Sequence, residues 1–174
     1  EGLIDFDASQ PLWRAFAVGT LNTLRVALMG IVLTTLLGTL VGVGKLSRNA
    51  LLRCLCASYV ELFRNIPLLL QLLMWYLLLT EMLPGLEHAW QLGDVYLSKG
   101  GMSFPWWDNG VWRRPQPGAF AMEGGGSLTP EFLALLLGLT LYTAAFVAEV
   151  VRSGLQAVAR GQTEAALSLG LSRA

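Results

Sequence analysis

Long apolar stretches separated by shorter polar ones dominate this chain. Three of them contain no charged residue over a length close to that of a membrane span, at 26–44, 65–80 and 132–148. An α-helix needs roughly 20 mostly apolar residues to cross the hydrocarbon core of a bilayer. The first and third stretches come close to this length, and the second reaches it if its helix is extended at both ends. The pattern predicts three membrane helices, at about 24–44, 58–83 and 131–152.

Residues 84–130 differ from these stretches because prolines and glycines interrupt them at short intervals. Pro84-Gly85, Pro115-Gln116-Pro117-Gly118 and Gly124-Gly125-Gly126 would each end a long helix. The segment is also richer in charged residues than its flanks. We expect an outer loop at 84–130, preceded by an outer N-terminal segment at 1–23.

Composition places the chain among membrane proteins. Hydrophobic residues make up 54% of its 174 residues and charged residues 14%, which is more apolar and less charged than an ordinary soluble domain. We therefore predict an all-α membrane protein. The formal net charge is zero, so no basic field indicates nucleic acid as a partner. Two cysteines and one histidine are too few and too scattered to indicate a metal site.

The charges are distributed unevenly between the two expected sides of the membrane. Residues 45–64, with Glu149 and 152–174, carry seven basic and three acidic residues, whereas the rest of the chain carries five basic and nine acidic ones. Basic residues favour the cytoplasmic side. We therefore expect 45–57 and 153–174 to be cytoplasmic, and 1–25 and 84–130 to lie outside.

Several polar residues fall within the second and third predicted helices. Such groups are costly in lipid and normally face a partner or a wet cavity. Glu61 and Arg64, and again Glu149 and Arg152, are three residues apart, so each couple could instead form a structural ion pair at the membrane surface. Pro67 should kink the second helix. The candidates for a pathway or gate are Glu61, Arg64, Gln71, Tyr142, Thr143, Glu149 and Arg152.

The segment that follows the third helix has the features of a short capped helix. Thr163 is a good N-cap, and Glu164 lies in the first turn, where the helix dipole favours an anion. Gly170 fits the position just beyond the C-terminus. A helix of two turns is marginal in water, so this one requires a partner to hold it.

Four patches, in this order and spacing, resemble the permeases of ABC importers of the polar and general L-amino-acid class, whose membrane domain has the MetI-like type I fold. They are 19–24, 59–67 with Gln71, 148–154, and 161–166 with Leu169-Gly170. The last patch resembles the EAA signature of these permeases. The chain ends within that signature, at Ala174, and we expect it to be a fragment of a longer permease that does not transport alone.

The resemblance implies a multi-pass subunit of the bacterial cytoplasmic (inner) membrane, with residues 24–174 as a partial transmembrane domain. It implies a second permease subunit, identical or different, a cytoplasmic ATP-binding subunit and a periplasmic amino-acid-binding protein. The coupling segment, 153–174, would bind the ATPase. The coupling residues on this analogy are Gly161, Gln162, Glu164, Ala165, Ala166 and Gly170.

We expect that the chain is not an enzyme and that it binds no cofactor itself. It lacks a phosphate-binding loop sequence of the Gly-x-x-x-x-Gly-Lys-Ser/Thr type, so ATP and Mg²⁺ would be bound by the partner ATPase. Two alternatives stay open. One is a type I permease for another small solute, and the other is a membrane-anchored ligand sensor, which would not depend on an ATPase.

Overall fold

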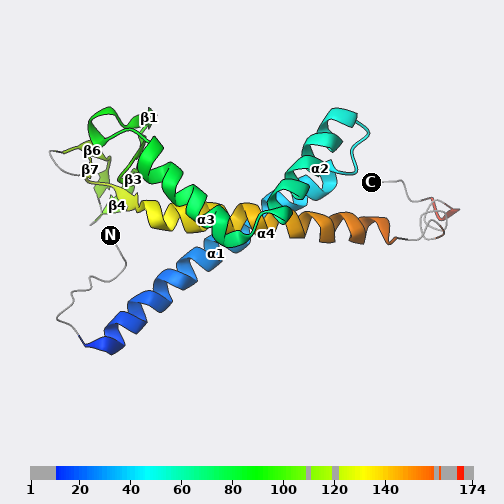
Figure 1. The fold of residues 1–174 in the computed structure, drawn as a ribbon, viewed down its shortest axis with the longest axis horizontal. Helices are drawn as coiled ribbons and strands as arrows, with labels where there is room; N and C mark the ends of the chain where they lie inside the picture. Colours follow the sequence, from blue (N-terminus) through cyan, green and yellow to red (C-terminus); the bar gives the residue numbers. More distant parts are fainter. Residues whose placement is uncertain (1–10, 109–110, 119–121, 159–160, 162–167, 171–174) are drawn as a thin grey trace. The chain divides into compact units, whose positions relative to one another are not determined.

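The computed structural model describes residues 11–108, 111–118, 122–158, 161 and 168–170. Four α-helices carry most of the fold (Figure 1): α1 (Leu12–Gly44), α2 (Ala50–Asn65), α3 (Leu68–Leu77) and α4 (Pro130–Gln156). Among the described helices, α1 and α4 are each long and apolar enough to cross a membrane. α2 and α3, with the π-helix η1 (Leu78–Met82) that continues α3, meet the same test only when taken together as one bent pair.

The break between α2 and α3 falls where the sequence predicts a kink. Ile66 and Pro67 have extended backbone conformations, with ψ angles of 125° and 136°. Proline lacks the N–H that a continuous helix would need, and its ring disfavours a helical conformation at the preceding residue. Asn49 caps the start of α2 by accepting hydrogen bonds from the backbone N–H groups of Leu51 and Leu52.

The chain divides into two compact units. The first, which we call the sheet unit, comprises Glu1–Ile31 and Pro67–Thr140. The second, which we call the glycine unit, comprises Val32–Ile66 and Leu141–Ala174. α1 and α4 each contribute one half to both units, while α2 belongs to the glycine unit and α3 to the sheet unit.

Large apolar side chains form the core of the sheet unit. Leu79 and Leu83, near the end of the second helical region, pack with Leu133 and Ala134 of α4 and with Leu128 of a strand. Trp75, Phe104 and other partly buried residues extend this cluster. Close packing of large apolar side chains is typical of a protein interior.

The segment between η1 and α4 contains short strands, which corrects the all-α prediction. After the 3₁₀ helix η2 (Leu86–His88), a four-stranded antiparallel sheet has the order β1-β2-β3-β8. Two small hairpins, β4-β5 and β6-β7, lie between β3 and β8 in the sequence. The strands are β1 (Trp90–Leu92), β2 (Val95–Ser98), β3 (Gly101–Phe104), β4 (Trp106–Asp108), β5 (Val111–Arg113), β6 (Gln116–Pro117), β7 (Met122–Glu123) and β8 (Gly126–Leu128).

Turn residues explain why a segment rich in glycine and proline forms these strands. Gly93 and Asp94 alone connect β1 to β2, and Gly93 has a φ of +63°. A two-residue hairpin turn requires such a conformation, which glycine adopts at no steric cost. The glycines and prolines that exclude a long helix are thus the residues that turn one strand into the next.

The helices also extend beyond the apolar stretches that predicted them. α1 begins at Leu12, although the sequence pattern indicated about residue 24, and α4 ends at Gln156 rather than near 152. The pattern identifies the apolar part of a helix, whereas backbone hydrogen bonding continues through charged residues such as Arg14 and Arg25.

Candidate functional site

Two glycines allow α1 and α4 to approach closely within the glycine unit. A Cβ atom added at Gly38 would lie 2.7 Å from Val147 Cβ, and one added at Gly42 would lie 2.7 Å from the backbone oxygen of Ala148. On the α4 side, Ala144, Ala145 and Ala148 are 0% exposed. Small residues on both helices bring the backbones together, as the Gly38-x-x-x-Gly42 spacing indicates.

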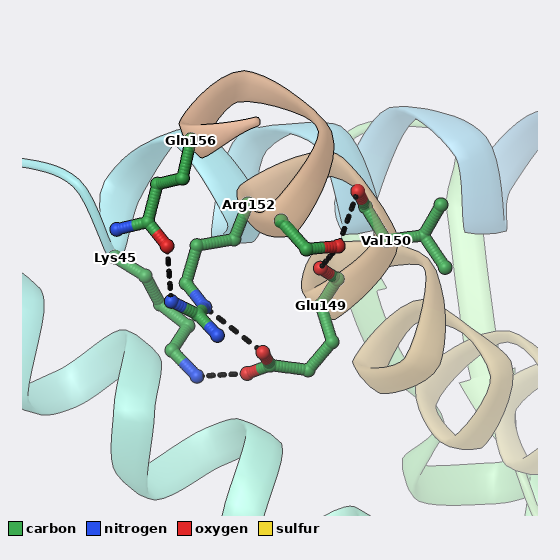
Figure 2. Close-up of polar contacts among 6 residues, drawn as sticks. Lys45, Glu149, Val150, Arg152 and Gln156 are labelled. Atoms are coloured by element: carbon green, nitrogen blue, oxygen red, sulfur yellow. Dashed lines mark hydrogen bonds and ion pairs between the residues drawn. The ribbon is translucent and has the colours of Figure 1, made fainter. Parts of the chain in front are cut away.

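Just beyond this close contact, one carboxylate binds two cations (Figure 2). Lys45, the residue after the end of α1, donates through Nζ to Glu149 Oε1. Arg152 Nε donates to Glu149 Oε2 over 2.9 Å. These three side chains are 15–33% exposed, so each charge is partly removed from water. The carboxylate therefore fixes the end of α1 to α4 while it neutralises only one of the two positive charges.

A further contact orients Arg152. Its Nη1 donates to Gln156 Oε1 over 2.6 Å, one turn further along α4. Ser153, on the same turn, donates back to the backbone oxygens of Glu149 and Val150, over 2.8 and 3.1 Å. Arg152 is thus held at two of its nitrogens, and its guanidinium has a defined orientation beside the carboxylate.

The expected Glu149–Arg152 pair is therefore present, but Glu61 and Arg64 behave differently. Arg64 lies over the ring of Phe146, with Cζ 5.1 Å from the ring centroid. The Phe146 ring in turn lies 5.0 Å from that of Tyr142. Glu61 is exposed, and within the described ranges no ion pair joins it to Arg64. A guanidinium is attracted to an aromatic face, which accounts for the contact that Arg64 makes.

The other two candidates for a pathway or gate lie in different surroundings. Thr143, on α4, is exposed in the glycine unit. Gln71, on α3, is only 1% exposed and belongs to the sheet unit. Within the glycine unit, the structure thus brings Glu149 and Arg152 together in one network, and joins Arg64 and Tyr142 through Phe146.

The predicted coupling helix lies largely outside the described residues. Gln162, Glu164, Ala165 and Ala166 belong to the range that the structure leaves out. Gly161 and Gly170 are described and exposed, and Gly170 has a φ of +79°. That left-handed conformation is the one that glycine adopts just beyond the end of a helix.

Two residues of this region escaped the sequence analysis. Lys45 entered only as a cytoplasmic charge, and its position immediately after the first apolar stretch is the sole sequence signal of its role. Tyr59 donates through its hydroxyl to the backbone oxygen of Leu141 over 2.7 Å, which joins α2 to α4. A tyrosine within a helix carries no sequence signal of which carbonyl its hydroxyl will reach.

Comparisons with known proteins agree on one family. The family profile described as "Binding-protein-dependent transport system inner membrane component" matches residues 30–174. The general L-amino acid transport system permease protein AapQ of Rhizobium johnstonii is 35% identical, over 98% of this chain and 58% of its own length. The glutamate/aspartate import permease protein GltJ of Escherichia coli K12 is 32% identical, over 92% of this chain and 52% of its own.

One solved structure is similar in fold. The structure described as "Crystal structure of an amino acid ABC transporter with histidines" is 25% identical and has a TM-score of 0.51, with 87% of this chain and 50% of that chain covered. The chain thus spans about half to three fifths of the length of the proteins to which it is compared.

Proposed function

This chain belongs to the family of binding-protein-dependent transport system inner membrane components, and from that premise we propose that it is a membrane-spanning permease subunit of an ATP-driven amino-acid importer. The observation that carries the proposal is the family match over residues 30–174, which includes every polar residue of the network around Glu149. The relatives AapQ and GltJ are both named as amino-acid permeases, which supports this solute class.

The proposal assigns transport, and no catalysis, to this chain. ATP and Mg²⁺ are bound and ATP is hydrolysed by a separate cytoplasmic subunit, while a second permease subunit and a periplasmic binding protein complete the importer. The polar groups on α3 and α4 then belong to the pathway or its gate, since such groups are costly where a helix faces lipid. Glu149, which binds cations from two helices, is the best placed of them to act as a gate.

The proposed orientation puts the bacterial cytoplasm at the end of α1 that carries Lys45. Residues 45–57 and 153–174 face the cytoplasm, and the strands of 84–130 face outward. In the full-length protein, single cysteines at Lys99 and Ala157, both exposed positions, should react with an impermeant maleimide from opposite sides of the membrane. Labelling of both from the same side would contradict the orientation.

The coupling segment provides the decisive experiment. In the full-length importer, Ala166→Asp places a charge on a small-residue surface that is expected to bind the ATPase closely. A charge that is buried without a partner costs several kcal/mol, about as much as breaking a buried ion pair. The variant should therefore insert normally but lose ATPase association or uncouple hydrolysis from uptake. Co-purification of the ATPase and solute uptake measure the two effects.

Ala50→Asp is the matched control. It adds the same charge at an exposed alanine at the start of α2, outside the coupling segment, and should leave ATPase association unchanged. Normal association and uptake in Ala166→Asp would contradict the coupling role. Coupled uptake of a solute that is not an amino acid would keep the coupling role but replace the proposed substrate.

A further inference from the structure

A positively charged cavity of about 440 Å³ lies within the glycine unit, beside the network of Figure 2. Lys45, Arg53 and Arg152 line it, each from a different part of the chain. Glu149 binds two of these three cations, so the cluster carries two more positive charges than negative ones. Leu46 and Cys54 give the cavity an apolar wall. Such a combination fits an anion that has an apolar part attached to it.

The cations retain hydrogen-bond donors beyond those that the network uses. A lysine ammonium has three N–H donors and an arginine guanidinium five. Lys45 donates to Glu149, while Arg152 donates through Nε to Glu149 and through Nη1 to Gln156. Arg53 gives one long contact of 3.4 Å to the backbone oxygen of Ser47. The fork of an arginine matches two oxygens of a phosphate group, so Arg53 and Arg152 supply the kind of donors that bind phosphate.

Exposed apolar side chains lie on the same helical turns as the cavity lining. Leu46 of the lining is 38% exposed, and Leu51 and Leu55, on the same turns of α2 as Arg53 and Cys54, are 68% and 61% exposed. In the orientation proposed above, this end of α1 and α2 lies at the cytoplasmic membrane surface. Basic pockets between membrane helices on that side bind the headgroups of anionic lipids, while their acyl chains contact apolar side chains.

We propose that this cavity is a phosphate-binding site for an anionic phospholipid headgroup, with Arg53 as its principal ligand. The inference rests on the proposed function, which supplies the membrane and the orientation. The shared chemistry is a phosphate oxygen bound by guanidinium and ammonium donors, and a soluble phosphate of the cytoplasm offers the same oxygens. Occupancy by lipid would hold the start of α2 against the end of α4 through a ligand that bridges Arg53 and Arg152.

The test measures ligand binding to the complete, detergent-solubilised importer. Dihexanoyl-phosphatidylglycerol, dihexanoyl-phosphatidylcholine and inorganic phosphate are titrated against the wild type, Arg53→Gln and Arg48→Gln. Arg48 is exposed in the loop just before α2 and does not line the cavity, so its substitution removes an equal charge without removing a ligand. Loss of Arg53 should weaken phosphatidylglycerol binding about five- to tenfold, and loss of Arg48 should weaken it less than twofold.

Each outcome of the titrations either supports or overturns the phosphate site. Phosphatidylglycerol that binds more tightly than phosphatidylcholine and inorganic phosphate, with dependence on Arg53, supports the lipid as the source. Inorganic phosphate that binds as tightly, with the same dependence on Arg53, supports the site with a soluble source. Binding that is independent of Arg53, or that weakens equally in Arg48→Gln, overturns the proposal.

A second measurement covers the case in which Arg53→Gln fails to assemble. Cys54 lines the cavity, so in an otherwise wild-type importer whose remaining cysteines are replaced, dihexanoyl-phosphatidylglycerol should slow maleimide labelling of Cys54 several-fold more than the phosphatidylcholine does. Equal rates with both lipids and with inorganic phosphate would overturn the site. ATP-driven uptake, measured in parallel, tests the proposed function separately, since an importer can lack this lipid site and still transport.

Discussion

The sheet unit and the glycine unit are each stabilised by a different kind of internal contact. In the sheet unit, Leu79, Leu128 and Leu133 fill a core with large apolar side chains. In the glycine unit, the fully buried residues of α4 are alanines, and the backbone oxygens of Ala144 and Ala148 lie against Gly38 and Gly42 of α1. Large side chains stabilise a core through the apolar volume that they fill, whereas small residues stabilise a helix contact through close approach of the backbones.

The two units should therefore be destabilised by different kinds of substitution. A core of large side chains is sensitive to lost volume, and a contact between small residues is sensitive to added volume. The polar contacts of the two units differ in their exposure to solvent. The glycine unit joins its helices through Glu149 and Tyr59, while the described part of the sheet unit has its ion pair between Arg114 and Asp94, where the side chains are 65% and 46% exposed.

The largest expected effect is in the sheet unit, where Leu133→Ala removes a side chain that is 7% exposed. The cavity that remains should lower the free energy of unfolding by about 2–5 kcal/mol. Leu137→Ala, one turn further along α4, alters a side chain that is 37% exposed and is the matched control. Chemical denaturation of the full-length protein in detergent measures both, and equal losses would contradict the role of Leu133 in the core of the sheet unit.

The next effect is in the glycine unit, where Gly42→Leu adds volume. Its Cβ would lie 2.7 Å from a backbone oxygen and 2.9 Å from Val151 Cβ, so α1 and α4 would have to separate. We expect a loss of about 1–3 kcal/mol. Gly30→Leu is the control on the same helix, because an added Cβ meets nothing within 4 Å there. If Gly30→Leu destabilises the protein as much, the close contact is not what makes glycine necessary.

A smaller effect should come from the shared carboxylate. Glu149→Gln leaves Lys45 and Arg152 without their common anion, at a cost of about 1–2 kcal/mol, because the three side chains are partly buried. Lys45→Met should cost less, since Glu149 keeps Arg152. Melting temperature and uptake separate stability from gating: reduced uptake in a variant that stays folded supports a gate. A larger loss of stability in Lys45→Met would contradict the central position of Glu149.

The smallest effect concerns the contact between α2 and α4. Tyr59→Phe removes the hydroxyl that donates to the Leu141 oxygen and leaves the ring, which lies 4.8 Å from that of Phe63. The expected loss is about 0.5–1.5 kcal/mol. Thermal unfolding of the full-length protein is the measurement, and an unchanged midpoint would show that water replaces this hydrogen bond.

The sequence predicts the helices better than it predicts the strands. The apolar stretches locate α1 and α4, and Pro67 predicts the break between α2 and α3. The Gly38-x-x-x-Gly42 spacing is a signal of close packing against another helix, but it does not identify the partner. These are local features, because each depends on spacing within one helix. The pattern does not predict the strands of 84–130, because prolines and glycines exclude a long helix without indicating a strand. Gly93-Asp94, between two short runs rich in apolar residues, was the available signal.

The candidate site was predictable only in part. The Glu149–Arg152 pair follows from a spacing of three along one helix, so the sequence contains it. The contact of Lys45 with Glu149 depends on the register of α1 against α4, and that register is set by which glycines and alanines meet. The side chain of Arg64 had two available partners, a carboxylate and an aromatic face, and the local sequence does not decide between them.

The break at Pro67 has a consequence for how the protein enters the membrane. α2 has 16 residues, or about 24 Å of helix, and α3 with η1 has 15, so in the proposed membrane setting each is shorter than the roughly 30 Å hydrocarbon core. α2 also carries Arg53, Glu61 and Arg64. We therefore expect α2 and α3 to enter the membrane together, as one bent pair, with α2 beginning at the cytoplasmic surface.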